Sequence, residues 1–172
     1  IIIHNVAQHF SSGVNLNAFL SMIREEDWSG IDKFLHKFQQ AVRSLKFSSV
    51  PVIGAPSGMA IGGGFEVLLR SDKIIAHTNS VLGLVESGVG LIPGGGGVKE
   101  TYLRCLTQLK NSNDAAWKTW MQIGYGQTGT SPEKSAELFY FLPERDQTEM
   151  NRDYLINAGI ALIKEINQMG YK

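Results

Sequence analysis

The chain has 172 residues, enough for one domain with a hydrophobic core, and 43% of its residues are hydrophobic. Its 16 basic and 16 acidic side chains give a formal net charge of zero, so charge gives no reason to expect nucleic acid or an anionic membrane as a partner. The longest apolar runs fall far short of the roughly 20 residues that a membrane span requires, and no signal peptide is recognisable. The single cysteine, Cys105, excludes an internal disulfide and favours a reducing compartment, so we expect a cytoplasmic protein.

The opening segment, residues 1–7, predicts a short strand, and residues 9–16 form the polar, glycine-bearing loop that follows it. The chain enters this strand with isoleucine as its first residue, without a methionine or a leading segment. We therefore expect the sequence to be a piece of a longer polypeptide.

Residues 31–45 predict an amphipathic helix, because apolar side chains recur there at i, i+3, i+4 and i+7. Ser29 followed by Asp32 resembles a capping box at the start of this helix. The apolar run over residues 50–55 predicts a strand, in which Pro51 must stand at the start or on an edge of the sheet.

A glycine triplet, residues 62–64, directly precedes an apolar run that favours a helix. The unpaired N–H groups and the dipole of a helix N-terminus favour an anion or a developing oxyanion there. Glu66 lies one turn inside this helix, and a second carboxylate, Glu86, follows 20 residues later in a loop. The combination favours acid–base chemistry on a polarised carbonyl, and the alternative is that the glycines only let a strand pack closely against a helix.

Two nucleotide-binding motifs fit this sequence poorly. The triplet 62–64 lacks the third glycine of G-x-G-x-x-G, and Glu66 would place a negative charge beside bound phosphates. Residues 94–99 (GGGGVK) superficially resemble a P-loop, but Lys99 does not directly follow a glycine and Glu100 replaces the Ser/Thr. Neither motif is favoured.

Strands and helices alternate through residue 109, and only helices are predicted beyond it, which indicates an α/β fold with a helical C-terminal tail. Ser131 and Pro132 mark the start of one of these helices, and Gly170 stops the last one. These elements are strands over residues 73–76 and 81–84 and helices over residues 98–109, 134–141 and 151–169.

No metal site is predicted, because the histidines show no ligand spacing and no acidic partner, and Cys105 has no neighbouring base that would activate it. Solvation or local hydrogen bonding is expected for His4, His9, His36 and His77. Packing in the core or at an interface is expected for Trp28, Trp117 and Trp120.

Three segments resemble, in their order and spacing, the enoyl-CoA hydratase/isomerase (crotonase) superfamily. They are HFSSGVNL (residues 9–16), PVIGAPSGMAIGGGFEVLLRSD (residues 51–72) and LGLVESGVGLIPGGGG (residues 82–97). The resemblance is close over residues 1–104 and loose beyond them. It implies an α/β fold with a crotonase-like (ClpP/crotonase) ββα-type core, N-terminally truncated by some 40 to 50 residues against the family. Residues 1–110 would form this core, and residues 111–172 a helical region of the same domain.

The resemblance also assigns roles to residues. It implies an oxyanion hole made of the backbone N–H groups of Val14 and Gly63, which would hold the thioester oxygen of an acyl-CoA. It implies that Glu66 and Glu86 are catalytic, and we expect Glu66 to deprotonate the attacking water and Glu86 to protonate C2, although the reverse assignment or shared tasks stay open. The residues expected to bind substrate or CoA are Ser12, Gly13, Asn15, Leu16, Gly62 and Gly64.

Hydration of 2-enoyl-CoA thioesters in fatty acid β-oxidation is the activity that this family resemblance implies. Family isomerases work with the later glutamate alone, so the presence of both carboxylates favours a hydratase. An isomerase on the same scaffold and a catalytically incomplete crotonase fragment are the alternatives. The acyl-CoA would be a substrate, and no metal or redox cofactor is expected. Trp117, Trp120 and Met121 lie at helical spacing, and lining of an acyl tunnel is an alternative to core packing for them.

The C-terminal segments MNRDYL (residues 150–155) and QMGYK (residues 168–172) resemble the hydratase region of bacterial bifunctional proteins that also contain a 3-hydroxyacyl-CoA dehydrogenase. No dinucleotide fingerprint lies within this sequence, so an NAD-binding dehydrogenase domain would belong to another part of the parent chain. Homo-oligomers of the trimer type are the habit of the family. Asn15 departs from the acidic residue that is frequent in the first loop of the family.

Overall fold

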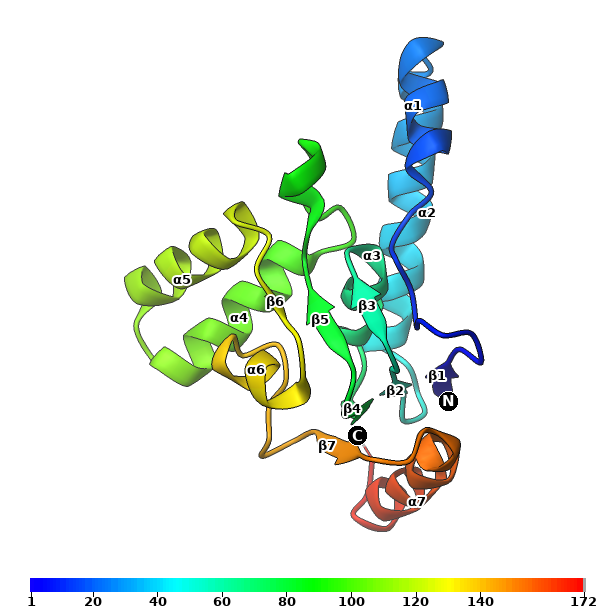
Figure 1. Ribbon diagram of the computed structural model, residues 1–172, viewed down its shortest axis with the longest axis vertical. Helices are drawn as coiled ribbons and strands as arrows, with labels where there is room; N and C mark the ends of the chain where they lie inside the picture. Colours follow the sequence, from blue (N-terminus) through cyan, green and yellow to red (C-terminus); the bar gives the residue numbers. More distant parts are fainter. Residues whose placement is uncertain (172) are drawn as a thin grey trace.

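The computed structural model describes residues 1–171, whose strands form two sheets (Figure 1). The larger sheet has the order β1-β2-β4-β7, and all of its neighbouring strands run parallel. Its strands are β1 (Ile2–His4), β2 (Ile53–Ala55), β4 (Lys73–His77) and β7 (Gln147–Glu149). The smaller sheet has the order β3-β5-β6, in which β3 and β5 are parallel and β6 is antiparallel to β5. Its strands are β3 (Met59–Ile61), β5 (Val81–Gly83) and β6 (Thr128–Gly129).

The chain steps from the larger sheet to the smaller one twice, from β2 to β3 and from β4 to β5. The first step depends on Gly58, whose φ of +63° lies in the left-handed region. A Cβ there would overlap the carbonyl oxygen of Gln8. Because β3 and β5 pair in parallel, their carboxyl ends lie side by side. The segments that follow these two strands carry the candidate glutamates.

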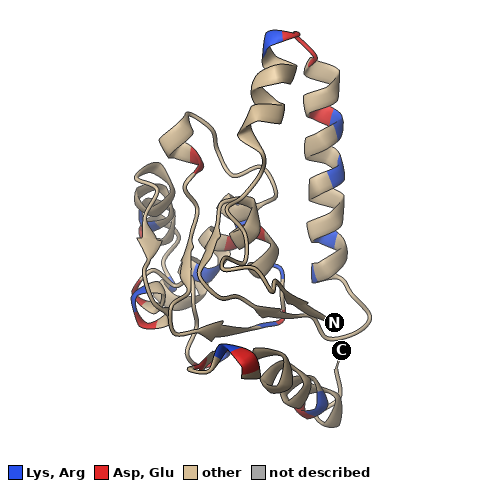
Figure 2. Ribbon diagram, turned by 45° about the vertical axis from the view of Figure 1, so that its right-hand side comes forward, with Lys and Arg blue, Asp and Glu red and all other residues tan. Residues whose placement is uncertain are grey.

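Two helices form a hairpin that projects from the sheets (Figure 2). They are α1 (Leu16–Arg24) and α2 (Trp28–Lys46). Asp27 caps α2 by accepting a hydrogen bond from the N–H of Gly30, so the predicted capping box at Ser29 and Asp32 is wrong. The sequence did not predict α1, which contains no buried residue.

The remaining helices follow the glycine-rich segments or pack on the sheets. They are α3 (Gly63–Leu68), the 3₁₀ turn η1 (Glu86–Val89), α4 (Gly97–Leu109), α5 (Ser112–Gly124), α6 (Pro132–Glu137), the 3₁₀ turn η2 (Arg152–Tyr154) and α7 (Leu155–Gln168). α7 covers the larger sheet, against which it buries Leu155, Leu162 and Ile166. Ser131 caps α6 with Pro132 at its first turn, and Gly170, with φ of +82°, follows the end of α7, as predicted.

The prediction of helices alone beyond residue 109 is wrong, because β6 and β7 add edge strands to the two sheets. β7 and β6 form backbone hydrogen bonds with β4 and β5, whose edge N–H and C=O groups would otherwise have no partner in a sheet. Other boundaries are shorter than predicted, since β1 has three residues and α6 ends at Glu137. Pro51 precedes β2, which lies inside the sheet between β1 and β4.

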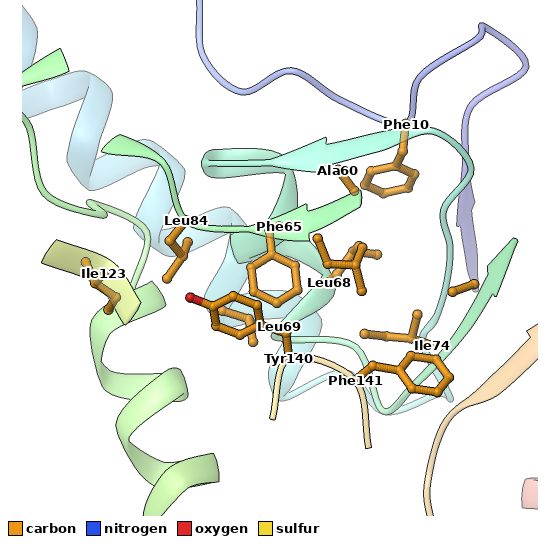
Figure 3. Packing of buried hydrophobic residues seen from close by; sticks show 12 residues of the cluster. Phe10, Ala60, Phe65, Leu68, Leu69, Ile74, Leu84, Ile123, Tyr140 and Phe141 are labelled. Carbon is orange, nitrogen blue, oxygen red and sulfur yellow. The ribbon is translucent and has the colours of Figure 1, made fainter. Parts of the chain in front are cut away.

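The main core lies beneath α3, where Phe65 and Tyr140 meet edge to face with ring centroids 4.9 Å apart (Figure 3). Both side chains are fully buried, so the core fixes the helix that carries Glu66. The tryptophans do not fill the core, since Trp28 is 60%, Trp117 65% and Trp120 57% exposed, and their packing at an interface stays a prediction. None of the helices described is both long and apolar enough for a membrane span.

Candidate active site

The first loop runs along the edge of β3 and reaches the start of α3. The N–H of Ser11 donates to the carbonyl of Met59 at 2.9 Å, and the N–H of Ile61 donates back to Ser11 at 3.1 Å. Gly13 has φ of +91°, and a Cβ on it would lie 3.7 Å from the nitrogen of Gly63. The backbone of the loop therefore lies directly against the glycine triplet.

Val14 and Gly63 present the two N–H groups predicted to form an oxyanion hole. Within residues 1–171, neither N–H donates a hydrogen bond to another protein group. The side chain of Val14 also approaches Gly63, where a Cβ would lie 3.5 Å from Val14 Cγ1. One donor at the start of α3 and another in the adjoining first loop, both without an acceptor within residues 1–171, can stabilise an oxygen that acquires negative charge.

The other two glycines of the triplet serve packing and backbone conformation. Gly62 has φ of +56°, which favours glycine. Gly64 packs so closely on Ser11 that a Cβ would overlap that side chain. Close packing therefore accounts for Gly64, whereas the exposed-amide explanation for Gly63 stays a prediction.

Glu66 is 2% exposed and is held by the glycine run 94–97. The N–H of Gly95 donates to both carboxylate oxygens, at 2.8 and 2.9 Å, and the N–H of Gly97 donates to Oε1 at 2.7 Å. Burial raises the pKa of Glu66, whereas the glycine amides and the charge of Arg70 oppose that rise. The amides also fix the orientation of the carboxylate.

Glu86 begins η1 and faces Gly62, where a Cβ would lie 3.4 Å from Glu86 Oε1. Its Oε2 is buried and has no hydrogen-bond partner within residues 1–171. Burial raises the pKa of Glu86, the negative charge of Glu66 raises it further, and the backbone groups of Glu86 and Val85 oppose the rise. Glu86 is therefore suited to hold a proton while Glu66 is ionised.

Both glutamates line a groove of about 580 Å³ between the glycine segments and the α1–α2 hairpin. Eight of the ten predicted site residues line it: Ser12, Gly13, Val14, Leu16, Gly62, Gly63, Glu66 and Glu86. Asn15 instead caps α1, by accepting a hydrogen bond from the N–H of Asn17 at 3.0 Å, and Gly64 packs on Ser11. The role of these two residues in binding stays a prediction.

Sequence reasoning missed two parts of this groove. One is its apolar wall on the hairpin, which includes Phe19, Ile31 and Phe34. The other is the use of Gly95 and Gly97 as donors to Glu66. The run of four glycines was the available signal for the second part, but the sequence alone does not show which side chain it contacts.

The part of the chain that the structure describes contains no group of three or more His, Cys, Asp or Glu side chains able to hold a metal ion. His4 and His9 hydrogen-bond to nearby backbone groups, Ala55 O at 2.8 Å and Met59 N at 3.2 Å. Cys105 is fully buried, and burial raises the pKa of its thiol, which disfavours the reactive thiolate.

The two sheets and the glycine-rich turn that joins β3 to α3 have the arrangement found in the crotonase fold of enoyl-CoA hydratases. An enoyl-CoA hydratase from Bacillus anthracis has the same fold, with a TM-score of 0.78 and 21% identity over 96% of this chain and 57% of its own. A family model described as "Enoyl-CoA hydratase/isomerase" matches residues 1–112. The chain therefore belongs to the enoyl-CoA hydratase/isomerase family, which confirms the predicted fold and resemblance.

The similar curated proteins are longer. A probable 3-hydroxyacyl-CoA dehydrogenase of Bacillus subtilis (strain 168) is 35% identical over 172 residues, which cover 100% of this chain and 22% of that protein. A putative fatty acid oxidation complex trifunctional enzyme of Rickettsia prowazekii (strain Madrid E) is 33% identical over 162 residues, which cover 94% of this chain and 22% of that protein. The chain thus spans about a fifth of the length of these relatives.

Proposed function

We propose that this chain carries the enoyl-CoA hydratase site of a larger fatty acid oxidation protein. The observation that carries this proposal is the placement of Glu66 and Glu86 in one groove with the free N–H groups of Val14 and Gly63. Hydration of a conjugated thioester needs each of these parts, because charge develops on the thioester oxygen while one proton leaves water and another reaches carbon.

In this mechanism the thioester oxygen of a 2-enoyl-CoA accepts hydrogen bonds from the Val14 and Gly63 amides. Glu66, ionised and held by Gly95 and Gly97, takes a proton from water as the water oxygen bonds to C3. The electron pair of the double bond moves to form the enolate, and protonated Glu86 delivers its proton to C2. One water is added overall, and a proton transfer between the glutamates restores the starting state.

The presence of both carboxylates in the groove favours the hydratase over an isomerase. An isomerase moves a proton between two carbons of the acyl chain and needs no group that activates water. Glu66, held rigidly by two amides, has no evident task in that reaction. The hydratase chemistry uses protein groups alone, so we propose no metal or redox cofactor.

The context of this site is also a proposal. The name of the B. subtilis relative supports a parent protein with a dehydrogenase domain, which we propose binds NAD and acts on the hydrated product, and the name of the R. prowazekii relative supports a multifunctional fatty acid oxidation protein. The lone, buried thiol of Cys105 supports a cytoplasmic location. Apolar side chains exposed on α1 and α2, such as Leu20 and Trp28, support a homo-oligomer of the trimer type.

A test of the function follows the loss of conjugated-thioester absorbance when a short 2-enoyl-CoA is added to the chain. Glu66→Gln and Glu86→Gln are expected to lower kcat by about 10²- to 10⁴-fold each, because each removes a proton-transfer group. Glu165→Gln, on the exposed face of α7, is the matched control and is expected to keep full activity.

Product analysis separates the alternatives. A 3-hydroxyacyl-CoA product supports the hydratase, whereas a shifted double bond that depends on Glu86 alone would identify an isomerase. A cooperatively folded chain that neither binds nor converts acyl-CoA would contradict the proposal and identify a catalytically incomplete crotonase fragment.

A further inference from the structure

Two side chains outside the predicted site hold the glycine run that binds Glu66. Gln39, on α2, donates from Nε2 to the carbonyl oxygen of Gly94 at 2.8 Å. Arg70, directly after α3, donates from Nη2 to the carbonyl oxygen of Gly95 at 3.3 Å. Two successive carbonyls of the run are thereby anchored to two different elements of the fold.

The carbonyl of Gly94 belongs to the peptide group whose N–H donates to both oxygens of Glu66. The carbonyl of Gly95 belongs to the next peptide group, whose Gly96 N–H helps to lower the pKa of Glu66. The carbonyl of Gly94 and the N–H of Gly95 share one planar peptide, and in a trans peptide they point in opposite directions. The same holds for the carbonyl of Gly95 and the N–H of Gly96. Gln39 therefore orients the peptide that donates to both oxygens of Glu66, and Arg70 orients the next one.

Arg70 is itself fixed by an ion-pair network. Its guanidinium is 7% exposed, and its Nη1 lies 3.0 Å from Glu100 Oε1. Lys46, at the end of α2, donates to both oxygens of Glu100 at 2.8 Å, and the exposed Lys99 lies 3.8 Å from it. The ion pairs thus tie Arg70, two residues after α3, to Glu100 of α4 and, through Glu100, to Lys46 of α2.

The run needs external anchors because glycine has more backbone freedom than any other residue. Gly96 has φ of +106°, and a Cβ on Gly96 would overlap the guanidinium of Arg70, so bulkier residues are excluded there. A Cβ on Gly95 would lie 2.5 Å from Phe38 and 2.8 Å from Glu66 Oε2. Glycine permits the close approach to Glu66, and side chains elsewhere must supply the rigidity.

We propose that Gln39 and Arg70 are positioning residues for the base, which hold the peptide planes of the glycine run so that its N–H groups fix the Glu66 carboxylate. This inference rests on the proposed function of Glu66. The charged or titratable groups that face Glu66 are Glu86 from η1 and Arg70 from the end of α3. Loss of the anchors lets the carboxylate turn away from its productive orientation.

The kinetic signature is a fall in kcat that exceeds the change in KM, most clearly for Arg70, which does not line the groove. Gln39→Ala and Arg70→Met are expected to lower kcat by about tenfold to 100-fold, the range found when a reacting group is displaced by about 1 Å. Arg70→Met also removes a charge that lowers the pKa of Glu66, so the acidic limb of its pH–rate profile moves to higher pH. Compared with Arg70→Met, Arg70→Lys restores the positive charge but only part of the hydrogen bonding. Arg70→Lys is therefore expected to return the pH profile closer to that of the unmodified chain than it returns kcat.

Matched controls come from the same helix. Gln40→Ala changes the neighbouring glutamine, which is exposed and makes no hydrogen bond to the run within residues 1–171. Arg43→Met removes a positive charge from an exposed arginine that lies over the ring of Phe47. Both controls are expected to keep the kcat and the pH profile of the unmodified chain.

Amide hydrogen exchange at Gly95 and Gly97, followed by NMR, tests the positioning without any turnover. Faster exchange at these amides in Gln39→Ala and Arg70→Met, but not in the controls, supports the inference even if the unmodified chain proves inactive and the proposed function fails. Unchanged exchange and unchanged kcat in folded variants overturn it. If Arg70→Met does not fold, the same exchange measurement on Arg70→Lys tests Arg70, and Gln39→Ala tests Gln39.

Discussion

Glu66 and Glu86 line the same groove but have opposite hydrogen-bond environments. Glu66 accepts from the amides of Gly95 and Gly97, whereas Glu86 keeps a buried Oε2 without a partner in the described chain. The glycine amides stabilise the ionised form of Glu66. The negative charge of the Glu66 carboxylate then makes ionisation of Glu86 more costly. The hydrogen bonds thus favour one division of labour, with Glu66 as the base and Glu86 as the acid, that the sequence left open.

The raised pKa of Glu86 predicts a pH-dependent stability. In the folded chain its pKa lies above the ordinary value of 4.5, so between these two pKa values the folded state binds more protons than the unfolded state. The contribution of Glu86 to stability is therefore complete below about pH 4.5 and is lost as the pH rises through the folded pKa. Glu86→Gln removes this loss, so the variant gains stability relative to the unmodified chain as the pH rises.

Urea unfolding of both proteins from pH 4 to pH 8 measures this difference. The control is Glu165→Gln, which removes an exposed carboxylate from α7 and is expected to follow the unmodified chain across the range. A difference between Glu86→Gln and the unmodified chain that stays constant with pH would show that the pKa of Glu86 is not raised on folding.

Val14 allows the backbone donor to be separated from the side chain. Val14→Ala keeps the N–H group and is expected to change kcat by less than about threefold, since the side chain supplies no reacting group. Val14→Pro removes the N–H and is expected to lower kcat by about 10²- to 10³-fold, as does the loss of other oxyanion-hole donors. Steady-state kinetics with a short 2-enoyl-CoA, together with thermal melting to confirm folding, measures both variants. Equal effects of the two substitutions would exclude a role for this amide.

Much of the groove was predictable because its chemistry depends on backbone features that need particular residues. The glycine triplet and the two glutamates stand at fixed places in the sequence, and the structure brings Gly63, Glu66 and Glu86 to one groove. The amides that hold Glu66 could not be predicted in the same way. Gly95 and Gly97 meet Glu66 only because α3 and α4 pack together, and sequence periodicity does not encode that contact.

The missed elements share a physical cause, which is that they lack a strong local pattern. β7 has three residues and no buried side chain, so it exists as a strand only because β4 offers it an edge. α1 depends on its Asn15 cap and on contact with α2. Trp117 and Trp120 fit a buried helical stripe by spacing, but they stack on each other at the surface of α5, with ring centroids 5.3 Å apart. The division of the chain at residue 110 stays a prediction.

Gly95 and Gly88 form a pair that tests the close approach of the glycine run. A Cβ on Gly95 would lie 2.5 Å from Phe38 and 2.8 Å from Glu66 Oε2, so Gly95→Ala must displace one of them. We expect a loss of about 1–3 kcal/mol in the free energy of unfolding, as for other overpacked sites. A Cβ on Gly88 meets no atom within 4 Å, so Gly88→Ala is expected to be neutral or slightly stabilising.

Chemical denaturation gives both free energies, and the catalytic assay adds a second comparison. Gly95→Ala is expected to lose activity beyond its loss of stability, because its Cβ intrudes on the base, whereas Gly88→Ala keeps activity. A Gly95→Ala variant as stable and active as Gly88→Ala would refute the tight packing of the run on Glu66.

Two tyrosines predict opposite effects of the same substitution. The hydroxyl of Tyr140 is fully buried and has no hydrogen-bond partner within residues 1–171, and burial raises its pKa well above the usual range. An unsatisfied buried hydroxyl is costly, so Tyr140→Phe is expected to raise the free energy of unfolding by about 1 kcal/mol while its ring keeps its contact with Phe65. The hydroxyl of Tyr171 instead lies 3.2 Å from Ser48 O and 3.1 Å from Asp72 Oδ2.

Tyr171→Phe is therefore expected to lower the free energy of unfolding by about 0.5–1.5 kcal/mol, the net value of a typical hydrogen bond. Urea unfolding at neutral pH measures both variants, with equal m values required for the comparison. Since each substitution removes one hydroxyl from an aromatic ring, the sign of the change reports only whether that hydroxyl is satisfied in the folded chain. A destabilised Tyr140→Phe would mean that its hydroxyl does have a partner in solution, and the core beside Glu66 would then contain a polar contact rather than an apolar wall.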